Sequence, residues 1–432
     1  MTINNNNLEI TVVDSMMGTG KTSFAIQMMD DESNTDKKYI FITPYLNEVE
    51  RVISSCSTRA FIQPEVSNGI NKKDNLKRLI AEGKDIVSTH ALFKKADEAL
   101  IELLYMEGYT LILDEVMGVI EQEPISTSDL KMLLQTEKLK YDELGFCQWN
   151  DEDYDKQGKF NNIRILAETN NLIIHNNTAL YWTFPVEAFK AFDKVYVLTY
   201  LFEGQLQRYY YDMFKVSYEY KSVGQVNGKY ELIDYIPYNH EDRSQIRELV
   251  NIHYSNLNDI GKEPTAFSST KLKKYATHTD YKLIRDRIKK DAYNFYRHKV
   301  KAPTEAVMWT TIKGDKEANK KALAPTGLNK EHKVITQENK TQKKFVEVNC
   351  RATNDFADKS VCIYLANIYM NPVLKGFVEE KGNLKVNEEL YALSELLQWT
   401  FRSRIRKNEP IDIYIPSSRM RGLLEQYLSN KL

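Results

Sequence analysis

Residues 15–22 read SMMGTGKT and decide how the first part of this 432-residue chain folds. An apolar run at residues 10–13 precedes them, and a stretch with helical character follows at residues 23–29. A strand, a glycine-rich turn and a helix in this order are typical of a P-loop, in which backbone N–H groups hold phosphate groups. Ser15 stands where the pattern has glycine.

Each residue type in this loop has a chemical reason. Lys21 is expected to reach the β- and γ-phosphates of a nucleotide, and the Thr22 hydroxyl is expected to bind Mg²⁺. The residues predicted to bind the nucleotide are Gly18, Thr19, Gly20, Lys21, Thr22 and Ser23. The alternative is an ordinary strand-to-helix turn that carries a chance Lys-Thr pair.

A second polar signal follows the apolar run at residues 109–113, where Asp114 and Glu115 stand side by side. Ligands of parallel sheets bind at the carboxyl ends of the strands, so these carboxylates are expected at the ligand edge. Asp114 is predicted to hold Mg²⁺ together with Thr22, and Glu115 to orient and deprotonate an attacking water. The alternative is a solvated acidic pair at the end of a strand.

Apolar runs alternate with helical patterns, which predicts an α/β fold with parallel sheets. The first strands are expected at 9–13, 38–43, 85–88 and 109–114, and the first helices at 21–29, 46–55, 74–82 and 91–105. Residues 142–162 are polar and indicate a surface insertion. Later strands are expected at 179–183, 194–200, 306–312, 345–350 and 411–415, and later helices at 243–256, 281–297, 357–370, 388–405 and 418–428. We predict a first lobe over 1–200, a connecting segment over 201–255 and a second lobe over 256–432.

Composition restricts the class of protein. No run of 18 apolar residues is present, which argues against a membrane span. The four cysteines have no metal-ligand spacing and indicate reduced thiols in the cytoplasm. Residues 256–346 contain 21 basic and 10 acidic side chains, with Tyr281, Tyr293, Phe295 and Tyr296 among them. This stretch could bind phosphates and stack bases, or it could be a solvated lysine-rich surface.

Further segments follow in an order that resembles the motifs of superfamily 2 helicases, in particular the phage-encoded DEAD/DEAH-box-like replication helicases. Besides SMMGTGKT and DEVM (114–117), they are ITPY (42–45), VSTH (87–90), WTFP (182–185), VMWTT (307–311), NCRATND (349–355) and QWTFRSRIR (398–406). The resemblance covers nearly the whole chain and implies two tandem RecA-like lobes with ATP and Mg²⁺ as cofactors. WTFP is a loose version of the family's Ser-Ala-Thr-Pro motif.

The resemblance also assigns roles to residues. Catalytic roles fall on Lys21, Asp114, Glu115, Arg402 and Arg406. Gln398 and Arg402 match the family spacing, but the family's second arginine would fall at Ile405, so Arg406 is one position late and Arg404 one early. Nucleic-acid contacts fall on Thr43, Pro44, Ser88, Thr89, His90, Arg351, Thr353 and Asn354. Hydroxyls at strand ends suit sugar-phosphate contacts, although Thr43 and Ser88 could equally cap helices.

The function we expect is an ATP-dependent helicase or translocase. Its partner would be single-stranded or partly duplex nucleic acid, DNA rather than RNA, together with replication proteins in the host cytoplasm. Two alternatives remain open: a P-loop kinase or simple NTPase switch, and a non-catalytic nucleic-acid-binding scaffold. The first predicts hydrolysis that polynucleotide does not stimulate, and the second predicts that Glu115→Gln leaves function intact.

Overall fold

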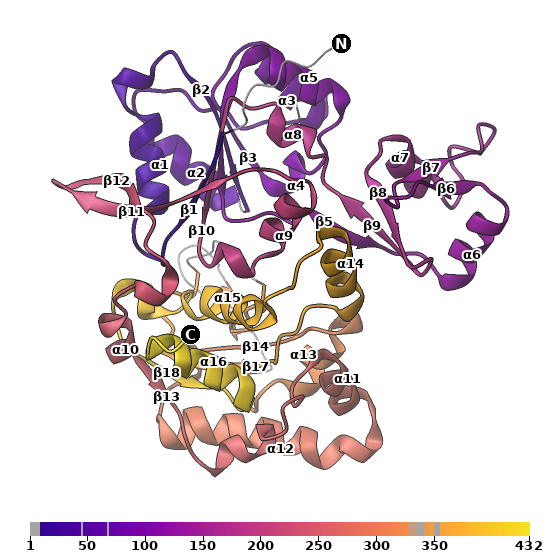
Figure 1. The fold of residues 1–432 in the computed structure, drawn as a ribbon. Coiled ribbons are helices and arrows are strands. Elements are labelled where there is room, and N and C mark those ends of the chain that lie inside the picture. Colours follow the sequence, from indigo (N-terminus) through magenta and orange to yellow (C-terminus); the bar gives the residue numbers. More distant parts are fainter. Residues whose placement is uncertain are drawn as a thin grey trace. The chain divides into compact units, whose positions relative to one another are not determined.

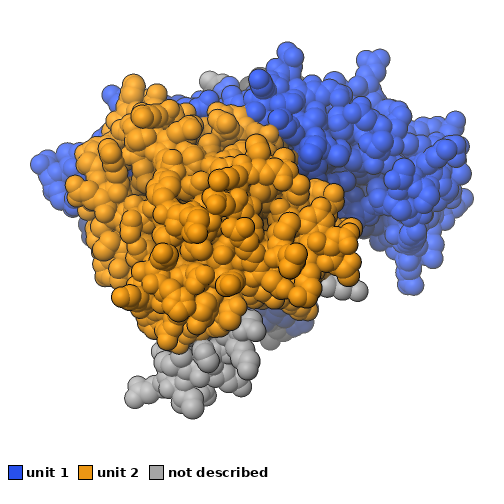
Figure 2. All heavy atoms as spheres, turned by 90° about the horizontal axis from the view of Figure 1, so that it is seen from below, with its two compact units in different colours: residues 1–235, 371–386 blue, residues 236–370, 387–432 orange. Residues whose placement is uncertain are grey.

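The computed structural model describes residues 9–44, 46–66, 69–328, 332–333, 341–342, 344–349 and 355–432. The chain divides into two compact units, which Figure 2 colours separately. The first unit contains residues 1–235 and 371–386, and the second contains residues 236–370 and 387–432. No helix among the described residues combines the length and the apolar character that a bilayer crossing requires.

A seven-stranded sheet forms the centre of the first unit (Figure 1). From edge to edge its strands are β12 (Lys229–Asp234), β11 (Glu219–Val226), β1 (Glu9–Asp14), β10 (Lys194–Thr199), β4 (Tyr109–Asp114), β2 (Lys38–Thr43) and β3 (Ile86–Thr89). All neighbours pair in parallel except β11 and β12. Central strands of such a sheet are buried on both faces, which explains their nearly continuous apolar sequences. The prediction of an α/β fold with parallel strands is confirmed.

The helices that pack around this sheet are α1 (Lys21–Met29), α2 (Leu46–Ser55), α3 (Lys72–Ala81), α4 (His90–Phe93), α5 (Glu98–Glu107), α8 (Glu187–Lys190) and α9 (Leu206–Met213). Of these, α1 to α4 begin within two residues of a predicted start, whereas α5, α8 and α9 were not predicted as separate helices. The single helix predicted at 91–105 is wrong, because the chain forms α4 and α5 there. The Asp97 carboxylate accepts a hydrogen bond from the Leu100 N–H and so starts α5 as a new helix.

An inserted subdomain, residues 120–183, lies between β4 and β10 and is drawn at the right of Figure 1. Its elements are β5 (Ile120–Glu123), α6 (Thr127–Gln135), β6 (Leu139–Tyr141), β7 (Cys147–Trp149), α7 (Asn161–Glu168), β8 (Leu172–His175) and β9 (Ala179–Thr183). It has its own buried cluster, which includes Leu130, Leu133 and Ile174. The predicted insertion at 142–162 is therefore part of a larger, packed subdomain.

Helix α14 (Pro372–Gly382) belongs to the first unit although its sequence neighbours belong to the second. Phe377 is fully buried, and its ring stacks on Tyr181 of β9 with the centroids 4.5 Å apart. The first unit therefore gains residues 371–386. It also extends to 235 instead of the predicted 200, because β11 pairs with β1 and brings β12 with it.

The second unit contains a four-stranded parallel sheet. Its strands in order are β13 (Val250–Ile252), β18 (Ile411–Tyr414), β17 (Val361–Leu365) and β14 (Val307–Thr311). The helices are α10 (Ser244–Leu249), α11 (Ser269–Thr277), α12 (Lys282–Asn294), α13 (Ala318–Leu323), α15 (Glu388–Thr400) and α16 (Ser418–Leu428). A separate pair, β15 (His332–Lys333) and β16 (Thr341–Gln342), is antiparallel.

The structure corrects two predicted elements of this unit and removes two aromatic residues from the open alternative of base stacking. The helix predicted at 357–370 is strand β17, whose five residues are all buried because it lies inside the sheet. The strand predicted at 345–350 is reduced to a single bridge between Phe345 and Trp309 among the residues described there. Phe295 and Tyr296 are core residues with at most 1% exposure, so they are not available for base stacking.

Candidate nucleotide-binding site

The glycine-rich loop connects the end of β1 to the start of α1 (Figure 1). Gly18 and Gly20 have φ angles of +86° and +96°, which non-glycine residues rarely adopt. Gly20 caps α1, and the Phe24 N–H already donates to the Gly20 carbonyl. The N–H groups of the first helical turn are thus directed at the loop, as phosphate binding requires.

Lys21 and Thr22 are the first two residues of α1, and they are predicted to bind the phosphates and Mg²⁺ respectively. The Lys21 Nζ donates to the carbonyl oxygens of Ser15 and Met16, at 2.5 and 3.0 Å, so the ammonium group lies over the loop. The Thr22 hydroxyl donates to Oδ1 of Asp114 at 3.2 Å. The structure therefore brings together the hydroxyl and the carboxylate that were predicted to bind Mg²⁺, although they are 92 residues apart.

Asp114 ends β4 and is only 8% exposed. Burial first, and then the nearby carboxylates of Glu115 and Glu48, raise the pKa of Asp114 to about 7. Arg51 and the Thr22 hydroxyl act in the opposite direction. A negative charge at this position is thus unfavourable without a cation, and a divalent cation would neutralise it.

Glu115 follows in a left-handed backbone conformation with a φ of +68°. Its N–H donates to the Leu198 carbonyl of β10 at 2.9 Å, which fixes the turn. The Glu115 Oε2 is buried and has no hydrogen-bond partner within the described part of the chain. A buried acceptor oxygen of this kind can accept a proton from water, which is the role that the sequence predicts for Glu115.

These residues fit a magnesium–nucleotide complex. One hydroxyl and one carboxylate are typical protein ligands for Mg²⁺ bound with a nucleotide, because phosphates and waters complete its octahedron. Among the described residues, no group of three or more His, Cys, Asp or Glu side chains is placed to hold a metal ion by itself. The described cysteines, Cys56, Cys147 and Cys362, are buried free thiols.

The residues predicted to contact nucleic acid divide into three groups. Thr43 is the last residue of β2 and Ser88 the next-to-last of β3, and both are buried. The Thr43 hydroxyl points to Oδ2 of Asp114 at 3.5 Å. Pro44, Thr89 and His90 are partly exposed at the same sheet edge. Thr89 precedes α4 without a side-chain cap hydrogen bond. Arg351, Thr353 and Asn354 lie outside the described residues, so their roles stay predictions.

The WTFP segment does not lie at this edge of the large sheet. Thr183 ends β9, which belongs to the antiparallel sheet of the inserted subdomain. The strand that lies between β1 and β4 is β10, and it ends at Thr199. The Thr199 carbonyl accepts the Ser15 N–H at 3.1 Å, so the end of β10 contacts the glycine-rich loop as well as Glu115.

Sequence reasoning missed two acidic residues near the loop. Glu48 in α2 is 8% exposed, pairs with Arg51 at 3.0 Å and raises the pKa of Asp114. The Asp14 carboxylate accepts the N–H groups of Leu201 and Phe202 at 2.8 and 3.0 Å. Glu48 follows Thr43-Pro44 closely, which was an available signal, but the partners of Asp14 are nearly 190 residues away.

The second unit holds the predicted arginines. Arg402 is 6% exposed and Gln398 is 4% exposed. In the part of the chain that is described, Nε of Arg402 and both amide atoms of Gln398 are buried without hydrogen-bond partners. Helix α15 ends at Thr400, and Arg406 is exposed in a 3₁₀ turn at Arg404–Lys407. The helix predicted at 388–405 therefore ends five residues early, and Arg402 and Arg406 do not lie on one α-helix.

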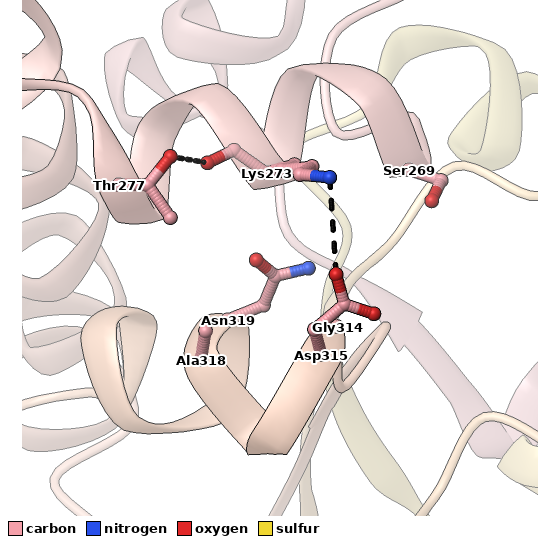
Figure 3. A pocket seen from close by; sticks show the side chains of 7 residues that line it. All are labelled: Ser269, Lys273, Thr277, Gly314, Asp315, Ala318 and Asn319. Atoms are coloured by element: carbon pink, nitrogen blue, oxygen red, sulfur yellow. Dashed lines mark hydrogen bonds and ion pairs between the residues drawn. The ribbon is translucent and has the colours of Figure 1, made fainter.

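A small pocket of about 200 Å³ lies between α11 and α13 of the second unit (Figure 3). It is lined by Ser269, Lys273, Thr277, Gly314, Asp315, Ala318 and Asn319. Its charged groups already pair with each other, because Lys273 lies 3.8 Å from Asp315. The volume is below the range of roughly 300–1,000 Å³ typical of small-molecule sites, and we assign it no ligand.

Comparison with known proteins identifies relatives. The model of the YonV C-terminal Rossmann-like domain matches residues 244–428, and that of the YonV middle domain matches residues 120–182, which coincide with the inserted subdomain. The SPbeta prophage-derived uncharacterized protein YonV of Bacillus subtilis (strain 168) is 37% identical over 432 residues, covering 98% of this chain and 99% of the relative.

Two solved structures show weaker likeness. S. tokodaii Xpd4 matches with a TM-score of 0.48 and 12% identity, covering 98% of this chain and 94% of that one. The DUF1998 helicase MrfA bound to DNA and AMPPNP matches with a TM-score of 0.34 and 10% identity, covering 99% and 49%. Likenesses this weak assign neither fold nor activity, so function is inferred from the chain's own residues.

Proposed function

The chain belongs to the YonV family, and from this premise and the geometry of its glycine-rich loop we propose that it is an ATP-dependent nucleic-acid helicase or translocase. The observation that carries the proposal is the convergence of Thr22, Asp114 and Glu115 at one edge of the large sheet. Two of these groups suit a Mg²⁺ ion, and the third has an available acceptor oxygen.

The residues of the first unit then have distinct tasks. The N–H groups of the loop and Lys21 bind the phosphates, and Thr22 and Asp114 would hold a Mg²⁺ ion, which would neutralise the phosphate charge. Glu115 orients a water molecule for attack on the γ-phosphorus and accepts its proton. The bond from that phosphorus to the bridging oxygen breaks, which yields ADP and phosphate.

Support for a motor, in preference to a kinase or a switch, comes from the second unit. It has a parallel sheet of its own and carries Gln398 and Arg402 with buried polar atoms that no described residue satisfies. Buried polar groups without partners are costly, and use by a ligand or a reaction is one reason for their retention. The assignment of Arg402 to hydrolysis follows from the resemblance and stays a prediction.

The choice of nucleic acid as the partner rests on the resemblance and on the basic helices. Residues 256–346 include 21 basic side chains, and α11 and α12 display most of their lysines to solvent. Such a surface binds phosphate backbones without reading sequence. The prophage origin of the relative agrees with a role in phage DNA replication or recombination, which is part of the proposal.

ATP hydrolysis with and without single-stranded DNA tests the proposal. The wild-type protein should hydrolyse ATP in the presence of Mg²⁺, and single-stranded DNA should raise the rate. Lys21→Ala should remove activity, whereas Lys37→Ala serves as a matched control because the Lys37 side chain is exposed and donates to Asn34, three residues away. A rate that DNA and RNA leave unchanged would exclude a translocase and favour an NTPase switch or a kinase. Activity that survives Lys21→Ala would exclude the loop as the catalytic site.

A further inference from the structure

Strands β11 and β12 form a hairpin, residues 219–234, whose side chains contact the glycine-rich loop at two separate points. Strand β11 pairs with β1 only as far as Val13 and Lys221. Beyond that register, β1 turns into the loop and backbone pairing ends. Beyond this point, hydrogen bonds that involve side chains connect the two segments in place of backbone pairing.

The first contact involves Ser15, the residue that stands where a P-loop has glycine. The Val223 N–H donates to the Ser15 hydroxyl at 2.9 Å, and the Ser222 hydroxyl donates to the Asp14 carbonyl at 3.1 Å. Ser15 is 4% exposed and Ser222 is 3% exposed. Glycine at position 15 would leave the Val223 N–H buried without an acceptor, and an unsatisfied buried donor is costly. The departure from the pattern therefore has a structural reason.

The second contact involves Tyr230 of β12. A Cβ atom on Gly20 would overlap the Cδ1, Cε1 and Cζ atoms of the Tyr230 ring, so the ring edge lies directly against Gly20. The Tyr230 N–H also donates to Oε1 of Gln27 in α1 at 2.9 Å. One residue of the hairpin thus contacts the cap of α1 and the body of the same helix.

We infer that the β11–β12 hairpin holds the glycine-rich loop in its phosphate-binding conformation, with Ser15 and Tyr230 as positioning residues. Ser15 fixes the entry to the loop and Tyr230 fixes its exit, immediately before Lys21. Neither side chain needs to contact the nucleotide, because both act through the backbone on which the N–H groups and Lys21 are carried. This inference rests on the proposed nucleotide-binding function.

Nucleotide affinity measured by calorimetry tests the inference, with magnesium and the non-hydrolysable analogue AMPPNP as the probe. Ser15→Ala and Tyr230→Ala should each weaken binding about tenfold, because an ordered loop must then be selected from a looser ensemble. Tyr230→Phe should bind like the wild type, because the ring edge and not the hydroxyl contacts Gly20.

A matched control separates positioning from general stability. Leu232 lies two residues from Tyr230 on the same face of β12 and packs against the same core, but the three atoms nearest to a Cβ on Gly20 all belong to Tyr230. Leu232→Ala should lower the melting temperature as Tyr230→Ala does and leave AMPPNP affinity within about twofold.

The outcomes are distinct. If the wild type binds AMPPNP, Lys21→Ala does not, and both Ser15→Ala and Tyr230→Ala bind like the wild type, the positioning role is overturned and the proposed function stands. If Leu232→Ala weakens binding as much as Tyr230→Ala, the effect is one of stability and the inference is also overturned. If the wild type binds no nucleotide, the proposed function is overturned together with the inference.

Discussion

Replacing Asp114 with asparagine is expected to stabilise the metal-free protein while it abolishes magnesium-dependent hydrolysis. Burial and the Glu115 and Glu48 carboxylates raise the pKa of Asp114 from its ordinary value of 3.8 to about 7. Between these two pH values the folded chain binds more protons than the unfolded chain does. The free energy of unfolding therefore falls as the pH rises from about 4 to about 7.

The size of the effect follows from the pKa difference. A shift of about 3 units, at about 1.4 kcal/mol for each unit, gives about 4 kcal/mol of destabilisation above pH 7. Asparagine has the same shape, and its Oδ1 can still accept the Thr22 hydroxyl. Asp114→Asn should therefore remove the charge without creating a cavity, and for a unit of this size the melting temperature should rise on the order of 10 °C.

Thermal unfolding in EDTA at pH 5 and pH 8 measures this difference. Asp114→Asn should have a clearly higher melting temperature than the wild type at pH 8, and the difference between the two melting temperatures should be smaller at pH 5. Asp36→Asn removes an exposed carboxylate and is the matched control, which should behave like the wild type at both pH values. Adding Mg²⁺ and ATP at pH 8 should stabilise the wild type and leave Asp114→Asn unchanged.

Two results would refute the reasoning. Equal melting temperatures of the wild type and Asp114→Asn at pH 8 in EDTA would mean that the buried carboxylate carries no electrostatic cost. A stability gain that is the same at pH 5 and pH 8 would point to packing instead of charge.

Three further predictions concern single side chains. Glu115→Gln should retain ATP binding but lose turnover by about 10²-fold or more in an ATPase assay, because the amide cannot accept a proton, and normal turnover would exclude Glu115 as the base. Arg402→Ala should lower kcat on the order of 10³-fold with little change in nucleotide affinity. Arg406→Ala should lower kcat far less, because Arg406 is exposed. Equal losses of kcat in both variants would contradict this ranking. Phe377→Ala removes a buried ring that stacks on Tyr181. The free energy of opening of α14, measured by hydrogen exchange, should therefore fall by about 3–5 kcal/mol. Replacement of the exposed Val373 by alanine should leave this free energy unchanged.

Local signals explain what the sequence predicts well. The glycine-rich loop, its strand and its helix are contiguous, and Asp114 ends an apolar run, so residues near each other in the chain determine these elements. The parallel sheet could be predicted because helices separate the strands. The pairing of Thr22 with Asp114 followed from the rule that ligands bind where parallel strands end.

Features that depend on distant residues were not predictable in the same way. Residues 361–365 are apolar throughout, and a short apolar run does not distinguish a buried strand from a buried helix. Helix α14 packs against β9 through Phe377 and Tyr181, which are 196 residues apart, and no local pattern assigns it to the first unit. Tyr230 likewise shows no sequence signal that connects it with Gly20.

The position of β10 shows what matching a motif by sequence alone does not supply. WTFP resembles a helicase motif in its letters, yet it ends a strand of the inserted subdomain. The end of β10 lies between β1 and β4, where the Thr199 carbonyl accepts the Ser15 N–H and the Leu198 carbonyl accepts the Glu115 N–H. Any shift of this strand end therefore acts on the phosphate-binding loop and on the proposed catalytic carboxylate together. A residue pattern can be matched anywhere in a chain, but this coupling requires a strand that lies between β1 and β4, and β10 is that strand.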